Sequence, residues 1–107
     1  MHINASLSTS RQRLVRMIGD IGFGAIERLF INDGEPEFGP ETILIRDKKF
    51  GKRDTSSAHE LRESPLSKIQ FEQLFEEFAD MGNGEVILLE FQNGLPFKIR
   101  TREPIGI

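Results

Sequence analysis

Apolar residues recur at helical spacing in two segments of the chain. Each segment stops at a glycine, Gly22 or Gly82, a residue that readily takes the left-handed conformation that ends a helix. Ser8, Thr9 and Ser10 offer caps for the first helix, and Ser64-Pro65 opens the second. We therefore predict helices at about 9–21 and 65–81. Their apolar stripes are Leu14, Val15, Ile18 and Ile21, and then Leu66, Phe71, Leu74, Phe75, Phe78 and Met81.

After each helix the spacing of apolar residues changes to the alternation of a β-strand. Asp33-Gly34 and Asn93-Gly94 are typical of tight hairpin turns, in which both central residues need positive φ. Gly39-Pro40 breaks or bulges the first return strand, because proline has no N–H for the ladder. The predicted strands are 25–32, 42–46, 85–92 and 95–102.

The two helix–hairpin segments repeat each other. Residues 14–36 align with 74–96 without a gap, at an offset of sixty positions. Such a fixed period indicates an internally repeated architecture. The identical pairs are Leu14/Leu74, Asp20/Asp80, Gly22/Gly82, Gly24/Gly84, Leu29/Leu89, Gly34/Gly94 and Pro36/Pro96.

These elements predict an α+β fold built from two α-β-β repeats, about 9–46 and 65–102, in a single domain spanning 1–107. Neither repeat can bury its apolar surface alone, so we expect a four-stranded antiparallel sheet with both helices on one face. The more apolar first strands, 25–32 and 85–92, are expected in the centre, although the opposite order stays open. The segment 47–64 has no period and reads as a loop, more in keeping with disorder than with function.

Composition narrows the class of protein. The chain has 107 residues, of which 37% are apolar and 29% charged, with a net charge of −3, values typical of one globular domain. With no cysteine it has no disulfide and no cysteine nucleophile, which fits the cytoplasm, where we expect it. No apolar run approaches the ~18 residues of a membrane span, and the first ten residues do not read as a secretory signal.

The sequence offers no catalytic, cofactor or metal constellation, and we therefore expect a protein that is not an enzyme. The two histidines, His2 and His59, lie at the terminus and in the predicted loop, away from rigid elements. Glu27 and Glu90 do not occupy equivalent repeat positions, which weakens a paired-acid interpretation. The turn Gly22-x-Gly24 follows a helix and precedes a strand, the reverse of the order in a phosphate-binding loop.

The sheet face away from the helices is the first candidate site. If Leu29, Ile31, Leu89 and Phe91 face the helices, strict alternation sends other apolar residues to the opposite face. A patch of that kind usually marks an interaction site, and a homodimer is the commonest way to cover it. Arg28 and Glu90 could then form an ion pair between copies. The alternative is that a bulge at Ile26, or the 47–64 loop, covers this face within one chain. The candidate interface residues are Ile26, Phe30, Leu44, Val86 and Leu88.

The second candidate site is the basic segment 46–53, which carries a net charge of +4 in eight residues. It could bind phosphate groups, with Phe50 stacking on a base, so that weak nucleic-acid binding is the alternative function. A loop that simply keeps the protein soluble explains the same charges and is favoured, because the domain as a whole is acidic. The candidate phosphate contacts are Arg46, Lys48, Lys49, Lys52 and Arg53.

At GAIERLFINDGEPEF and GEVILLEFQNGLPFKI the chain resembles a group of small hypothetical bacterial proteins of unassigned function. The resemblance supports the fold and implies no activity, cofactor or substrate. Our expectation is therefore a small non-enzymatic interaction module that self-associates or binds a protein partner. The residues that carry the resemblance are Gly24, Ile26, Glu27, Leu29, Ile31, Asp33, Gly34 and Pro36, and then Gly94, Leu95, Pro96 and Phe97.

Overall fold

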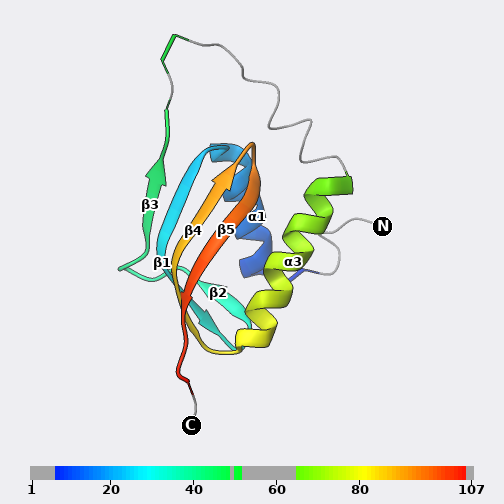
Figure 1. Cartoon of the computed structure of the whole chain (residues 1–107), viewed down its shortest axis with the longest axis vertical. Helices are drawn as coiled ribbons and strands as arrows, with labels where there is room; N and C mark the ends of the chain where they lie inside the picture. The colour runs from blue at the N-terminus through cyan, green and yellow to red at the C-terminus, as the bar shows by residue number, and fades with distance from the viewer. Residues whose placement is uncertain (1–6, 49, 52–64, 106–107) are drawn as a thin grey trace.

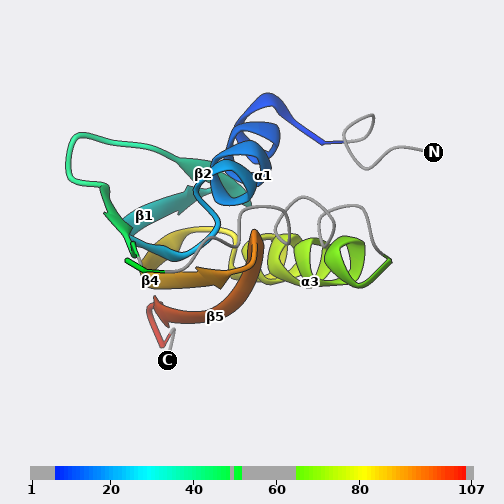
Figure 2. The same cartoon turned by 90° about the horizontal axis from the view of Figure 1, so that it is seen from above.

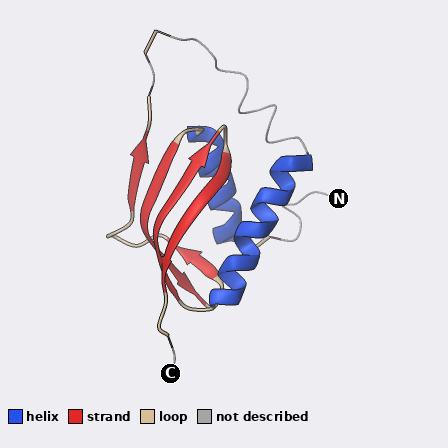
Figure 3. Ribbon diagram, in the orientation of Figure 1, coloured by secondary structure: helices blue, strands red, loops and turns tan. Residues whose placement is uncertain are grey.

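The computed structural model describes residues 7–48, 50–51 and 65–105, and within them it confirms an α+β fold of two helices and an antiparallel sheet (Figure 1 and Figure 3). Both helices lie on one side of the sheet, as the view from above makes clear (Figure 2). The elements in chain order are α1 (Thr9–Ile21), β1 (Gly24–Asn32), β2 (Glu35–Glu37), β3 (Ile43–Arg46), α3 (Pro65–Met81), β4 (Gly84–Gln92) and β5 (Leu95–Arg102).

The helix boundaries follow local signals. Helix α1 is capped by Ser8, whose Oγ accepts a hydrogen bond from the N–H of Arg11 at 3.3 Å. It ends at Gly22 (φ 86°), whose N–H donates to the carbonyl of Ile18. Helix α3 begins at Pro65 and is followed by Gly82 (φ 72°). The predicted helices at 9–21 and 65–81 are thus confirmed.

The central position of the two first strands is also confirmed, because the sheet order is β2-β1-β4-β5 with β3 added beside β1. The predicted count of four strands is wrong, since the described residues form five. β2 and β3 pair with the same edge of β1, β2 along Phe30–Asn32 and β3 along Gly24–Glu27. Between them the chain leaves the ladder around Gly39-Pro40, where Thr42 N–H bonds the Gly39 carbonyl instead. The proline break therefore divides the return strand in two.

One hydrophobic core lies between the sheet and the helices. It uses the apolar stripes of both helices, as predicted, and one face of β1 and β4; Leu66 of the predicted stripe lies outside the residues whose side chains are described. The side chains at its centre are completely buried, among them Phe78, Leu29 and Leu89. The core residues are Leu14, Ile18, Ile26, Leu29, Ile31, Phe71, Leu74, Phe75, Phe78, Val86, Leu89, Phe91 and Leu95.

Two irregularities change which residues of β1 and β4 enter this core. Arg28 adopts φ 60°, and Ile26 and Leu29, three positions apart, are both buried. In β4 the register shifts between Val86 and Leu88, and Val86 and Leu89 are both buried. An extra residue in a strand reverses the alternation beyond it. Ile26 and Val86 are consequently core residues, and their predicted place on the uncovered face was wrong.

The two hairpin turns connect the halves of the molecule. Asp33 and Gly34 have φ of 55° and 78°, and Asn93 and Gly94 have 55° and 76°, as predicted for tight turns with positive φ. The N–H of Gly34 donates to the carbonyl of Gly82 at 2.7 Å, and that of Gly94 donates to Gly22 at 2.9 Å. Each hairpin is thus held by the end of the helix in the other half.

Candidate functional site

The sheet face away from the helices is defined by the strand register, because directly paired residues lie on the same face. We call the twelve residues on this side the open face. They form three rows, each crossing the sheet from the β2–β3 edge to β5. The rows are Ile45, Ala25, Glu90 and Lys98; Ile43, Glu27, Leu88 and Arg100; and Glu37, Phe30, Glu85 and Arg102.

The apolar part of the open face differs from the predicted one. Phe30 and Leu88 lie there as expected, each half-buried. Leu44 pairs with the core residue Ile26 and so lies on the other side, which corrects its prediction. Its neighbours Ile43 and Ile45 take its place, with 50% and 37% of their surfaces exposed. The apolar patch therefore extends toward β3 rather than along the centre of the sheet.

Charges on the open face are ordered by strand. The acids Glu27, Glu85 and Glu90 are on the central strands and Glu37 is on β2, whereas the bases are on β5. Arg28 pairs within its own chain, with Glu41 at 3.0 Å and Glu85 at 3.6 Å, rather than with Glu90. Surface ion pairs of this kind contribute only about 0–1 kcal/mol to the stability of the fold. Their main effect is to keep this face polar.

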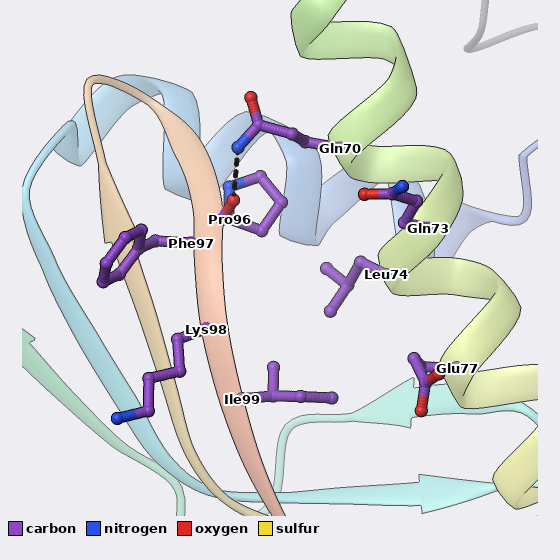
Figure 4. A pocket seen from close by; sticks show the side chains of 8 residues that line it. All are labelled: Gln70, Gln73, Leu74, Glu77, Pro96, Phe97, Lys98 and Ile99. Atoms are coloured by element: carbon purple, nitrogen blue, oxygen red, sulfur yellow. Dashed lines mark hydrogen bonds between the residues drawn. The ribbon is translucent and has the colours of Figure 1, made fainter.

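A pocket that the sequence did not predict lies between α3 and β5 (Figure 4). Its volume is about 170 Å³. Pro96 and Ile99 point toward α3, whereas Phe97 and Lys98 point away from it. This arrangement depends on a register shift of β4 and β5 at Glu90/Phe91, for which the sequence carries no local signal. We call the lining residues the α3–β5 groove: Gln70, Gln73, Leu74, Glu77, Pro96, Phe97, Lys98 and Ile99.

A polar cluster at the start of α1 joins three elements. Glu35 on β2 accepts hydrogen bonds from the hydroxyls of Ser8 and Ser10, and Arg11 lies 3.5 Å from its carboxylate. Arg11 also donates to the Gly34 carbonyl at 2.9 Å and sits over the ring of Phe75 on α3. Burial by itself would raise the pKa of Glu35, but the two hydroxyls and Arg11 together hold it below its ordinary value. The cluster fastens the β1–β2 hairpin to both helices, which is a structural role.

The candidate phosphate contacts are only partly within the described structure. Arg46 pairs with Gly24 at the end of β3, and both Arg46 and Lys48 are exposed. Lys49, Lys52 and Arg53 lie outside the described residues, as do both histidines. Among the described residues no group of three acids, histidines or cysteines could hold a metal ion. No helix in that same part of the chain is long and apolar enough to cross a membrane.

Comparison with known proteins leaves these surfaces without a precedent. No family model matches the chain, and neither a curated protein nor a solved structure matches it. The open face and the α3–β5 groove therefore have to be interpreted from their own chemistry.

Proposed function

We propose that this protein is a small non-enzymatic interaction module that forms a homodimer through its open face. The observation that supports this is an apolar patch of Phe30, Ile43, Ile45 and Leu88 on a side of the sheet that neither helix covers. An antiparallel sheet with one solvated face normally carries polar residues there. Packing two such faces together at about 10 Å would remove the patch from water.

The charges of the open face favour one orientation of the dimer. If the twofold axis runs parallel to the strands, β5 of one copy lies over the β2–β3 edge of the other. Arg102 then approaches the second copy's Glu37, and the stem of Arg100 covers its Ile43. An axis across the strands would place β5 over β5, with Lys98, Arg100 and Arg102 facing one another. Like charges in contact are unfavourable, so we expect the first arrangement.

Light scattering at tens of micromolar tests this proposal. We expect the wild type to have the mass of a dimer and Phe30→Glu and Leu88→Glu to have that of a monomer, because each places a carboxylate in the apolar contact. Ile69→Glu is the control, since it makes the same change at an exposed aliphatic residue (47%) on α3, on the helix side. Circular dichroism establishes that each variant is folded. A monomeric wild type, or folded face variants that remain dimers, would contradict the proposal.

We also infer that the halves 9–46 and 65–102 are structural repeats. The β1–β4 register supports this, because it pairs Ile26 with Leu89 and Leu29 with Val86, a pattern that is unchanged when the halves are exchanged at an offset of sixty. The reciprocal glycine bonds between hairpins and helix ends support it in the same way. Such a duplication would give the open face an approximate internal twofold symmetry of its own.

Weak nucleic-acid binding through 46–53 stays the alternative function. Of its five candidate contacts only Arg46 and Lys48 lie within the described residues, both exposed and near the β3 end of the sheet. Nothing in the described structure brings them together with the basic residues of α1 or β5. The open face therefore carries the stronger argument.

A further inference from the structure

Strand β5 forms one edge of the sheet. Within the described residues β5 (Leu95–Arg102) pairs only with β4, through every residue of the strand except the bulged Phe97. An edge strand presents backbone N–H and C=O groups that can pair with another strand. The edge is regular after its bulge at Phe97, and its one proline, Pro96, stands near its start. Most of this edge is therefore able to accept an additional strand.

The α3–β5 groove runs beside that edge on the helix side (Figure 4). Its apolar part comprises Leu74, Pro96 and Ile99, and the amides of Gln70 and Gln73 line its wall on α3. Its volume of about 170 Å³ is close to that of the ~150 Å³ apolar cavity that takes up a benzene molecule. It has room for one aliphatic side chain.

Gln70 already hydrogen-bonds the backbone of the edge strand. Its Nε2 donates to the carbonyl of Pro96 at 2.8 Å (Figure 4). A side chain of α3 thus takes the position that an N–H of a neighbouring strand would occupy. An incoming strand can replace this bond with one of its own, so the exchange conserves the hydrogen-bond count.

The other side of the edge is basic. Lys98, Arg100 and Arg102 are exposed and lie in the rows of the open face, away from α3. In the part of the chain that the structure covers, none of the three forms an ion pair. Pairing β5 with β5 of a second copy would bring these like charges close together, which is unfavourable. A strand with acidic side chains on that face is the complementary partner.

We propose that β5 accepts an extended segment of a partner protein in which acidic and apolar residues alternate. Successive side chains of a strand point to opposite faces. The acidic residues therefore face Lys98, Arg100 and Arg102, while the apolar residues face α3 and one of them enters the α3–β5 groove. This is strand addition to a sheet edge, in which backbone bonds supply affinity and side-chain pockets supply specificity. The inference goes beyond self-association, because it uses the backbone edge and the helix side of β5, although it shares Arg100 and Arg102 with the proposed dimer contact.

An NMR titration of the ¹⁵N-labelled chain tests the site. The probe is a synthetic peptide of twelve residues in which Glu and Val alternate, and the control contains the same six Glu and six Val as a repeat of Glu-Glu-Val-Val. We expect the alternating peptide to shift the amides of 95–102 and 70–77 and to bind at least fivefold more tightly than the control. No shift at millimolar peptide, equal binding of the two peptides, or shifts confined to other strands would overturn the proposal. So would β5 shifts that follow protein concentration alone, because these would identify a second copy as the occupant.

Variants test the basic side of β5 and the α3–β5 groove separately. Arg100→Glu should weaken binding at least tenfold, whereas Lys48→Glu, an identical charge change at an exposed residue away from β5, should leave it unchanged. Gln73→Trp should abolish binding by filling the groove, and Gln70→Ala should preserve or strengthen it by freeing the Pro96 carbonyl. Equal effects of Arg100→Glu and Lys48→Glu, or loss of binding in Gln70→Ala, would contradict the proposed geometry. Repeating the titration in Phe30→Glu keeps the result independent of self-association.

Discussion

Replacing Gly24 by alanine should detach β3 from the sheet while the core stays folded. Gly24 has φ +153°, and a Cβ built there would lie 2.1 Å from the carbonyl oxygen of Ile45 on β3. Carbon and carbonyl oxygen normally stay about 3.3 Å apart, so β3 would have to retreat by about 1 Å along its pairing with β1. We expect a cost of roughly 3 kcal/mol, from ~1–3 kcal/mol of backbone strain and the loss of ladder hydrogen bonds worth ~1 kcal/mol each.

Gly22→Ala is the matched control for this change. Gly22 also has positive φ, +86°, but no atom beyond its chain neighbours lies within 4 Å of a Cβ placed there. It should therefore show the backbone strain alone, about 1–2 kcal/mol. A loss of 1 kcal/mol lowers the melting temperature of a domain this size by about 4–8 °C, so the two variants should differ measurably.

Hydrogen exchange then locates the damage. In Gly24→Ala the amides of Ile43–Arg46 should lose protection while those of Val86 and Leu89 keep it, since β3 is exposed and β4 is in the core. In Gly22→Ala the β3 amides should keep their protection. If Gly24→Ala melts no lower than Gly22→Ala, or if the β3 amides stay protected, the close approach of Ile45 to Gly24 does not require a glycine at position 24.

Two further predictions concern the hairpins. Gly34→Val and Gly94→Val should each destabilise the protein by about 2–3 kcal/mol, because a β-branched residue is strongly disfavoured at φ 78° and 76°; urea unfolding measures this, and two unchanged midpoints would refute it. Glu35→Gln should make the free energy of unfolding less sensitive to acid. The folded-state pKa of Glu35 lies below its ordinary 4.5, so its carboxylate stabilises the fold above that pH and loses this effect as the pH falls through the folded-state value. The stability gap between wild type and Glu35→Gln should thus be full at pH 7 and shrink below about pH 4.5; a gap that grows on acidification would reverse this sign.

The elements of this fold could be predicted from the sequence because their signals are local. Ser8 and Gly22 bound α1, and Asp33-Gly34 and Asn93-Gly94 fix the hairpins through conformations that glycine tolerates and most residues avoid. The apolar spacing of α1 and α3 identified the helix faces that enter the core. The division of the first return strand was only half predicted, since Gly39-Pro40 indicated a break but not the separate pairing of β2 and β3 with β1.

Which residues line the two candidate surfaces was decided by the tertiary structure. Arg28 holds φ 60° although it is not a glycine, and the contacts that accompany this conformation come from elsewhere in the chain: Thr42 donates to its carbonyl at 2.9 Å, and Glu41 and Glu85 pair with its side chain. Because these partners lie elsewhere in the chain, the residues around Arg28 could not have predicted the contacts. One extra residue at this point sends Ile26 into the core and brings Ile43 and Ile45 to the open face. The α3–β5 groove likewise exists only because a helix and an edge strand that are separated in the chain by β4 lie beside each other, so periodicity fixed the elements and tertiary packing fixed the surfaces.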